Sequence, residues 1–160
     1  MQQPIAKQVP RVIEFAVKGA PLTQGSKVAF VINGRAIMHE MSDKKTKSRP
    51  KNALKIWRQR IANAATYGGL AMGWTGAILL ECEFVFPRFK SHFTAKGTLA
   101  SGAPMIPRED LDKLIRAVGD ALSGVVYEDD RQITGFGAST KRFAKTREAI
   151  GGVRIRVTEL

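Results

Sequence analysis

The sequence predicts an α+β fold, in which strands and two main helices share one domain. Strand-like alternation of apolar and polar residues occurs near both ends and in the middle of the chain, and two stretches with helical spacing lie between. At 160 residues, the chain is long enough for one domain that buries about two-thirds of its unfolded surface. We therefore expect a single domain over residues 1–160, with a flexible N-terminus at 1–11.

The N-terminal part of the chain is predicted to open with β structure. Residues 12–17 alternate in hydrophobicity as a half-buried strand does. Residues 28–32 and 35–38 have the composition of two further strands, and they flank Asn33-Gly34, a strong short-range signal of a hairpin turn. The pattern predicts one strand followed by a hairpin.

The second half of the chain holds the longest strand signal. Apolar residues alternate from Ile78 to Phe86, which predicts a central or near-central strand that ends at Pro87. The single cysteine, Cys82, lies in this run, so we expect a buried thiol and no internal disulfide. Two closing strands are expected at 133–140 and 152–158.

Two amphipathic helices are predicted between these strands. Pro50 marks the start of the first, whose apolar residues recur at helical spacing over 53–65. The second, over 111–122, has the cleanest apolar stripe and is closed by Ser123-Gly124. Residues 88–107 are predicted to form a long loop, and loops of this length are usually functional or disordered.

Acidic residues are concentrated in one short segment of a basic chain. Residues 109–130 carry seven of the fourteen acids and only Lys113 and Arg116 as bases, a formal charge of −5 against +17 for the rest. A basic body binds polyphosphate, because each neutralised phosphate releases condensed counterions. An acidic spot would repel that ligand unless a cation such as Mg²⁺ lies between carboxylates and phosphate. Such metals promote hydrolysis at phosphorus, so a metal-dependent nuclease is the first hypothesis.

The strongest basic tract covers the start of the first predicted helix. Eight Lys or Arg and no acid lie between Lys44 and Arg60. This density favours contact with the phosphates of a nucleic acid, and a solvated helix face is the alternative. The candidate DNA-binding residues are Lys27, Lys44, Lys45, Lys47, Arg49, Lys51, Lys55, Arg58 and Arg60.

Each acid also has an ordinary structural explanation. Asp110 is placed to cap the helix that follows Pro107. Asp112 and Arg116 have the four-residue spacing of a surface ion pair, and Asp129-Asp130 are common turn residues. At this density of acids in a basic background, these explanations are weaker than a metal site.

Several function classes find no support in the sequence. His39 and His92 have no cysteine or second histidine at zinc-ligand spacing. No glycine-rich phosphate loop or common hydrolase motif occurs, so no small-molecule cofactor is expected. No aromatic-rich basic strand favours an RNA-binding module. The longest apolar run is too short for a bilayer and no signal-peptide pattern occurs, so the cytoplasm is the expected compartment.

Residues 110–132 carry a series of motifs at fixed spacing. They contain Asp110-Leu111-Asp112, then Asp120-Ala121-Leu122, and finally Asp129-Asp130-Arg131-Gln132. This series resembles the signature of the RusA family of Holliday junction resolvases, common in bacteria and phages: D-x-D-N, a lysine four residues after the second Asp, D-A-L, and D-D-x-Q. Weaker similarity extends to Gly25-Ser26-Lys27 and to the helix around Trp57-Arg58.

The resemblance implies a small mixed β-sheet with two main helices, assembled as a homodimer in the cytoplasm of a bacterium or of a phage's host. It implies binding of four-way DNA junctions and paired nicking of opposing strands in DNA recombination and repair, with Mg²⁺ or Mn²⁺ held by carboxylates. The family's three essential acids fall on Asp110, Asp112 and Asp130. Asp129 is a further candidate metal ligand, and Asp120 matches the acid of D-A-L.

The spacing of the first two acids sets a condition on this site. Asp110 and Asp112 would lie about 200° apart on a regular helix. They converge on one metal only if Asp110 precedes the helix and points back across it. Pro107 favours such a boundary.

Two positions depart from the family signature. Lys113 replaces the asparagine, and Arg116 replaces the catalytic lysine. Arginine can clamp a phosphate through two hydrogen bonds but cannot exchange a proton. Lys113 lies one turn from Arg116, so both are candidate catalytic cations. The lost lysine keeps a non-catalytic DNA-binding accessory protein as the alternative function.

Overall fold

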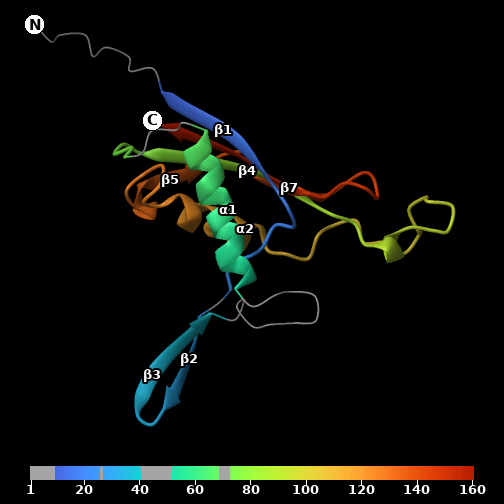
Figure 1. Ribbon diagram of the computed structural model, residues 1–160, viewed down its shortest axis with the longest axis horizontal. Helices are drawn as coiled ribbons and strands as arrows, with labels where there is room; N and C mark the ends of the chain where they lie inside the picture. Colours follow the sequence, from blue (N-terminus) through green and yellow to red (C-terminus); the bar gives the residue numbers. More distant parts are fainter. Residues whose placement is uncertain (1–9, 26, 41–51, 69–72) are drawn as a thin grey trace, which may run out of the picture.

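The structure is a computed structural model that describes residues 10–25, 27–40, 52–68 and 73–160. Its strands and helices in these ranges confirm the predicted α+β class (Figure 1). The strands are β1 (Arg11–Lys18), β2 (Lys27–Ile32), β3 (Arg35–Glu40), β4 (Ile78–Phe86), β5 (Ile133–Phe136), β6 (Thr140–Phe143) and β7 (Gly152–Glu159). The helices are α1 (Ala53–Tyr67) and α2 (Leu111–Leu122), with the short 3₁₀ helices η2 (Lys90–His92) and η3 (Asp130–Gln132).

The main sheet has five strands in the order β1-β7-β4-β5, and β6 also pairs with β4. β1, β7 and β4 run antiparallel, whereas β5 and β6 run parallel to β4, so the sheet is mixed. β4 is therefore central, as its sequence predicts. Every second residue of β4 is buried, including Cys82, and burial raises the pKa of that thiol to about 12.

The strand predicted at 133–140 is in fact two strands. β5 and β6 pair with successive parts of β4, and the chain turns between them. In this turn the Ser139 N–H donates to the Gly137 carbonyl at 2.7 Å, and the Ser139 hydroxyl accepts from the Cys82 N–H at 3.1 Å. A side chain in place of Gly137 would collide with Glu81. The predicted strand ran through Gly135, Gly137 and Ser139 and therefore missed this turn.

The two helices pack against one face of the sheet and enclose the core (Figure 1). Trp57 and Ile61 of α1 and Leu114 and Val118 of α2 are each at most 3% exposed and belong to one core cluster with fully buried Phe84 of β4. Burial of each such aliphatic side chain stabilises the fold by roughly 1.5–3 kcal/mol. The apolar stripe of α2 is thereby fixed against the core, which leaves its polar side facing outward.

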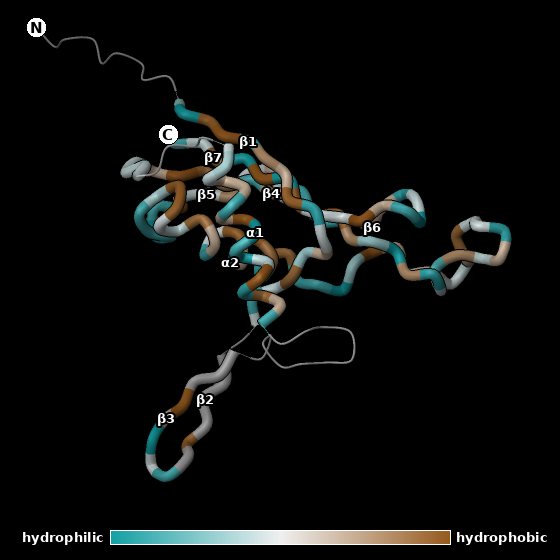
Figure 2. The backbone as a smooth tube through the Cα atoms, in the orientation of Figure 1, coloured by the Kyte–Doolittle hydropathy of each residue, from teal (hydrophilic) through white to brown (hydrophobic). Residues whose placement is uncertain are grey.

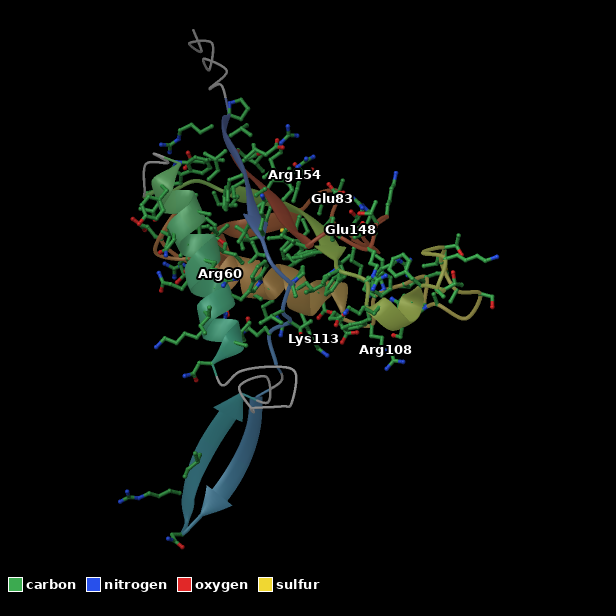
Figure 3. The ribbon with its side chains drawn as sticks, turned by 45° about the vertical axis from the view of Figure 1, so that its right-hand side comes forward. Arg60, Glu83, Arg108, Lys113, Glu148 and Arg154 are labelled. Carbon is green, nitrogen blue, oxygen red and sulfur yellow. The ribbon has the colours of Figure 1, made fainter. Side chains whose placement is uncertain are left out.

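The opposite face of the sheet carries ion pairs. Arg156 lies 3.3 Å from Glu14, and Arg154 lies 3.9 Å from Glu14 and from Glu83. Figure 3 labels Glu83 and Arg154 on this face. Exposed pairs contribute roughly 0–1 kcal/mol each, so they keep the face polar more than they stabilise it.

The predicted hairpin is formed by β2 and β3. Asn33 and Gly34 at its turn have φ values of 50° and 75°, the positive values that a two-residue type I′ turn needs. The hairpin extends away from the main sheet and the helices in Figure 1.

The predicted long loop at 88–107 contains η2 and one isolated β-bridge, between Phe93 and Leu99. Of the N-terminus predicted to be flexible, residues 1–9 lie outside the described residues, and Arg11 begins β1. Pro50 also lies outside them, and α1 begins at Ala53. Within the described ranges, no helix has the length and apolar character needed to cross a membrane.

Candidate active site

A cleft of about 990 Å³ beside α2 gathers three acids and one arginine. Asp112, Arg116 and Asp120 come from α2, and Asp130 comes from the first position of η3. The structure thus brings together three of the predicted catalytic residues, Asp112, Arg116 and Asp130. The remaining lining residues are Gln24, Gly25, Leu111, Ile115, Gly119, Ile133 and Phe136.

Helical spacing explains why the polar residues of α2 share one side. Asp112, Arg116 and Asp120 follow each other at intervals of four residues, so they lie one above another. The core fixes the opposite side through Leu114 and Val118, both fully buried. Arg116 Nη2 lies 3.9 Å from Asp112 Oδ2, and both side chains are more than 60% exposed. The predicted surface ion pair is therefore present, and it lies in the cleft.

Asp120 is held from the other helix. Arg58 Nη2 donates to Asp120 Oδ2 at 3.1 Å, and the two side chains are 26% and 28% exposed. We predicted that Arg58 would face solvent as a phosphate contact, and this half-buried ion pair corrects that orientation. The partners are 62 positions apart, so no local spacing could reveal them.

Asp110 does not line the cleft. It occupies the N-cap position of α2, as predicted, but its side chain makes no capping hydrogen bond. Instead Lys113 Nζ donates to Asp110 Oδ2 at 2.5 Å. This hydrogen bond and charge hold the pKa of Asp110 below its usual value and raise the pKa of Lys113. The carboxylate is therefore bonded to Lys113, and Asp110 is not among the residues that line the cleft with Asp112.

The two acids of the segment Asp129–Gln132 have different surroundings. The Asp129 carboxylate accepts from the Arg131 N–H at 2.9 Å, and Gln132 Oε1 accepts from the Asp129 N–H at 3.0 Å, which forms a capping box. Gln132 Nε2 also donates to the carbonyls of Trp74 and Gly76, at 2.8 and 3.0 Å. Asp129 thus stabilises the turn, as the structural alternative for this residue predicted, while Asp130 lines the cleft.

A lysine outside the signature fixes the approach to α2. Lys141 Nζ on β6 donates to the carbonyls of Pro107 and Glu109, at 3.1 and 2.5 Å. The loop that ends at Asp110 is thereby tied to the main sheet. Sequence reasoning missed Lys141, because its alternating neighbours give no sign of a contact made more than thirty positions away.

The basic tract is described only in part. Lys44, Lys45, Lys47, Arg49 and Lys51 lie outside the described residues. Within them, Lys55 and Arg60 are exposed on α1 (Figure 3 labels Arg60), and Lys27 begins β2.

The lining of the cleft fits a hard cation in its chemistry. Mg²⁺ needs only one or two carboxylates when phosphate oxygens and water complete its ligands, and Asp112 and Asp130 both face the cleft. The side-chain oxygen of Gln24, also in the lining, is buried without a hydrogen-bond partner among the described residues. Among the described residues, no group of three or more Asp, Glu, His or Cys side chains is arranged to hold a metal ion.

These features define a class: a basic α+β protein whose acids and arginine meet in one open cleft, a composition suited to phosphodiester chemistry. The family model for endodeoxyribonuclease RusA matches residues 33–158, and the chain belongs to the RusA endodeoxyribonuclease family. No curated protein matches the chain significantly. Family membership confirms the resemblance found in residues 110–132.

Proposed function

We propose that this protein is a Mg²⁺-dependent, structure-selective endonuclease that resolves Holliday junctions by paired nicks in DNA recombination and repair. The observation that carries this proposal is the cleft in which Asp112, Asp120 and Asp130 face Arg116, in a chain of the RusA family. Metal-dependent cleavage of a phosphodiester uses carboxylates to hold the cation and can use a cationic side chain to bind the phosphate, and both kinds of residue line this cleft.

In the proposed mechanism, Asp112 and Asp130 would hold the cation. Asp120 also lines the cleft, and Asp110 and Asp129 are further candidate ligands from the same two motifs. The chemistry that Mg²⁺ or Mn²⁺ supplies when bound is polarisation of a phosphoryl oxygen and activation of water. Asp110 could join this set through Oδ1 while Lys113 holds Oδ2, so that Lys113 would orient the carboxylate toward the cation.

The two cations of α2 have different tasks in this proposal. Arg116 faces the cleft, where its planar guanidinium suits a bidentate contact with the scissile phosphate. Lys113 is 37% exposed and is engaged with Asp110 outside the lining of the cleft. We assign to Arg116 the stabilisation of the negative charge that develops on the phosphate in the transition state. We assign to Lys113 the orientation of the Asp110 carboxylate.

The exposed cations around α1 are proposed to contact DNA phosphates. Lys55 and Arg60 would extend the basic surface of Lys27 and the tract Lys44–Lys51, whereas Arg58 is engaged with Asp120. Such contacts position the duplex without reading its sequence. Neutralising Lys44, Lys45 and Lys47 together should lower the slope of log affinity against log salt by about two to three units, at roughly 0.9 per phosphate contact. An unchanged slope would identify the tract as a solvated face.

Coordinated nicks on two opposing strands are most simply made by two clefts, so a homodimer in the cytoplasm is the proposed working form. Light scattering at micromolar concentration measures the assembly directly. A stable monomer that still makes paired nicks would contradict the dimer and leave the nuclease intact.

The deciding experiment uses the purified chain and a synthetic four-way junction, with Mg²⁺, with Mn²⁺ and with EDTA. We expect symmetric nicks in opposing strands with either metal and none with EDTA, and little cleavage of linear duplex of the same sequence. Tight junction binding with no nick under any metal would favour the alternative, a non-catalytic DNA-binding accessory protein. That alternative has one observation behind it, the replacement of the family lysine by Arg116.

A further inference from the structure

The loop between β4 and α2 is a basic arm beside the cleft. Residues 88–108, here called the arm, contain Arg88, Lys90, Lys96 and Arg108 and no acid, a formal charge of +4. In Figure 1 the arm projects from the side of the molecule beyond the end of the sheet. A connection of this length with so little secondary structure of its own is uncommon in a compact domain unless it has a function.

The outer part of the arm is held in shape by its own hydrogen bonds. The Thr94 N–H donates to the Thr98 carbonyl at 2.8 Å, and the Ala100 N–H donates to the His92 carbonyl at 3.0 Å. Gly97 makes the turn between these two sides, with a φ of 79°. The result is a short finger whose tip carries Lys96.

The base of the arm is attached to the body at both ends. Arg88 donates from Nε to the Ala144 carbonyl at 3.2 Å and from Nη1 to the Pro104 carbonyl at 3.0 Å. Its guanidinium also lies 4.6 Å from the centre of the Phe143 ring. At the far end, Lys141 holds the carbonyls of Pro107 and Glu109. These contacts fix the arm relative to Asp110 and α2.

One aromatic ring on the arm is exposed yet oriented. The Phe89 side chain is 69% exposed, and its ring meets His92 edge to face at 5.3 Å and 88°. His92 is buried and packs in the same manner against Phe143 at 5.5 Å. Edge-to-face contacts of this kind orient a ring. Phe89 is thus held pointing outward by a buried partner, although burial of its own surface gains little.

The exposed surface of the arm is both apolar and cationic. Leu99, Met105 and Ile106 are exposed at 41%, 72% and 69%, and Figure 2 shows apolar and polar stretches side by side along the arm. Lys90, Lys96 and Arg108 are exposed and form no ion pair among the described residues. Arg108 is labelled in Figure 3 near the start of α2.

We propose that the arm is the element that contacts the branch point of DNA, with Phe89 stacking on a base exposed there. Nucleic acids with accessible bases are bound by exposed aromatic rings next to cations, and architectural proteins insert apolar side chains between base steps. The surplus of positive charge favours DNA over a protein partner, because an interface between proteins is depleted of lysine. The inference rests on the proposed function and supplies the contact that would select branched over linear DNA.

The test uses a four-way junction with 2-aminopurine at the crossover, with Ca²⁺ in place of Mg²⁺ so that binding is measured without cleavage. The wild-type protein should raise the fluorescence as the base unstacks. Phe89→Ala should abolish this rise and weaken junction binding by about 5- to 150-fold, the scale of one lost stacking contact, with affinity for linear duplex unchanged. Phe89→Trp should preserve both signals.

Tyr67→Ala is the matched control, since Tyr67 is an aromatic residue, 88% exposed, at the end of α1. It should leave the fluorescence rise and the junction affinity unchanged. Thermal unfolding of each variant checks that the fold is kept.

Three results would overturn the inference. If Phe89→Ala keeps the fluorescence rise and the preference for junctions, the arm does not contact the branch point. If Phe89→Ala instead lowers the mass by light scattering and leaves unstacking intact, the arm is an interface between copies of the chain. If the wild-type protein shows no preference for the junction in binding or in nicking with Mg²⁺, the proposed function falls as well.

Discussion

Asp110 and Asp112 at the start of α2 can be compared with Asp129 and Asp130 at the start of η3. In each pair one carboxylate is used locally: Asp110 bonds Lys113, and Asp129 accepts from Arg131. The other member of each pair, Asp112 or Asp130, lines the cleft. The cleft thus receives one acid from each motif, and local hydrogen bonds decide which one.

The two local partners differ in kind, and this separates the pairs. Asp129 is fixed by backbone N–H groups in a capping box, which persists as long as η3 is folded. Asp110 is fixed by one exposed side chain, and exposed ion pairs are weak. A cation in the cleft could therefore recruit Asp110 far more easily than Asp129.

The largest effect is expected from substituting the two acids that line the cleft, Asp112 and Asp130. Asp112→Asn and Asp130→Asn should each reduce the single-turnover rate of nicking by about 10³, because loss of a metal ligand removes several kcal/mol of transition-state stabilisation. Junction binding in Ca²⁺ should persist or tighten as repulsion of phosphate falls.

Asp129→Asn provides the internal control for these variants. The asparagine side-chain oxygen can still accept from Arg131, so the capping box is kept and nicking should stay within a few-fold of wild type. A loss equal to that of Asp130→Asn would show that Asp129 is a metal ligand in its own right.

The next effect separates the two cations of α2. Arg116→Ala should slow nicking by about 10² to 10³, the scale of one lost electrostatic donor at a transition state. Arg116→Lys, which restores the residue of the family signature, should retain activity. Lys113→Ala should cost only about 10-fold, as expected of a residue that orients a ligand.

Equal losses in Arg116→Ala and Lys113→Ala would contradict this division of work. Near-normal nicking by the double variant would remove both cations from catalysis. Both outcomes are read in the same single-turnover assay, with junction affinity measured alongside.

Much of the fold follows from apolar periodicity, because the core demands it. The buried positions of β4 and α2 lie where alternation and helical spacing place them, and Asn33-Gly34 forms the predicted turn. The break between β5 and β6 was missed, since it depends on Ser139 meeting Cys82 across the sheet.

The composition of the cleft was predictable to a lesser degree. Asp112, Arg116 and Asp130 were chosen through the resemblance to the family signature, and all three line the cleft. The contact of Arg58 with Asp120 joins residues far apart in sequence, and the direction of the Asp110 side chain depends on competition between Lys113 and the backbone. Neither leaves a periodic signal.

A smaller effect, on the stability of the fold, is expected from substituting Gln132, which holds the segment of Asp129 and Asp130 in place. Gln132→Ala removes the hydrogen bond that Gln132 Oε1 accepts from the Asp129 N–H. It also removes the two that Gln132 Nε2 donates to the carbonyls of Trp74 and Gly76. We expect a loss of about 1–3 kcal/mol in the free energy of unfolding by urea, because polar groups are left without partners. Gln59→Ala is the control, since its exposed hydrogen bond to Asn63 should matter by less than about 0.5 kcal/mol. Equal stability of the two variants would deny Gln132 its role.

The smallest effect is expected from removing the ion-pair partner of Asp110. Lys113→Met removes the partner that lowers the pKa of Asp110, so that pKa should rise toward its usual value in an NMR titration of the carboxyl carbons. An aspartate with a lowered folded-state pKa stabilises the fold above its unfolded pKa, and this contribution is lost as the pH falls through the folded pKa. Stability of the wild type should therefore decline slightly more steeply on acidification than that of Lys113→Met, by a small amount because both side chains are exposed. An Asp110 titration identical in both proteins would mean that the Lys113 contact does not persist in solution.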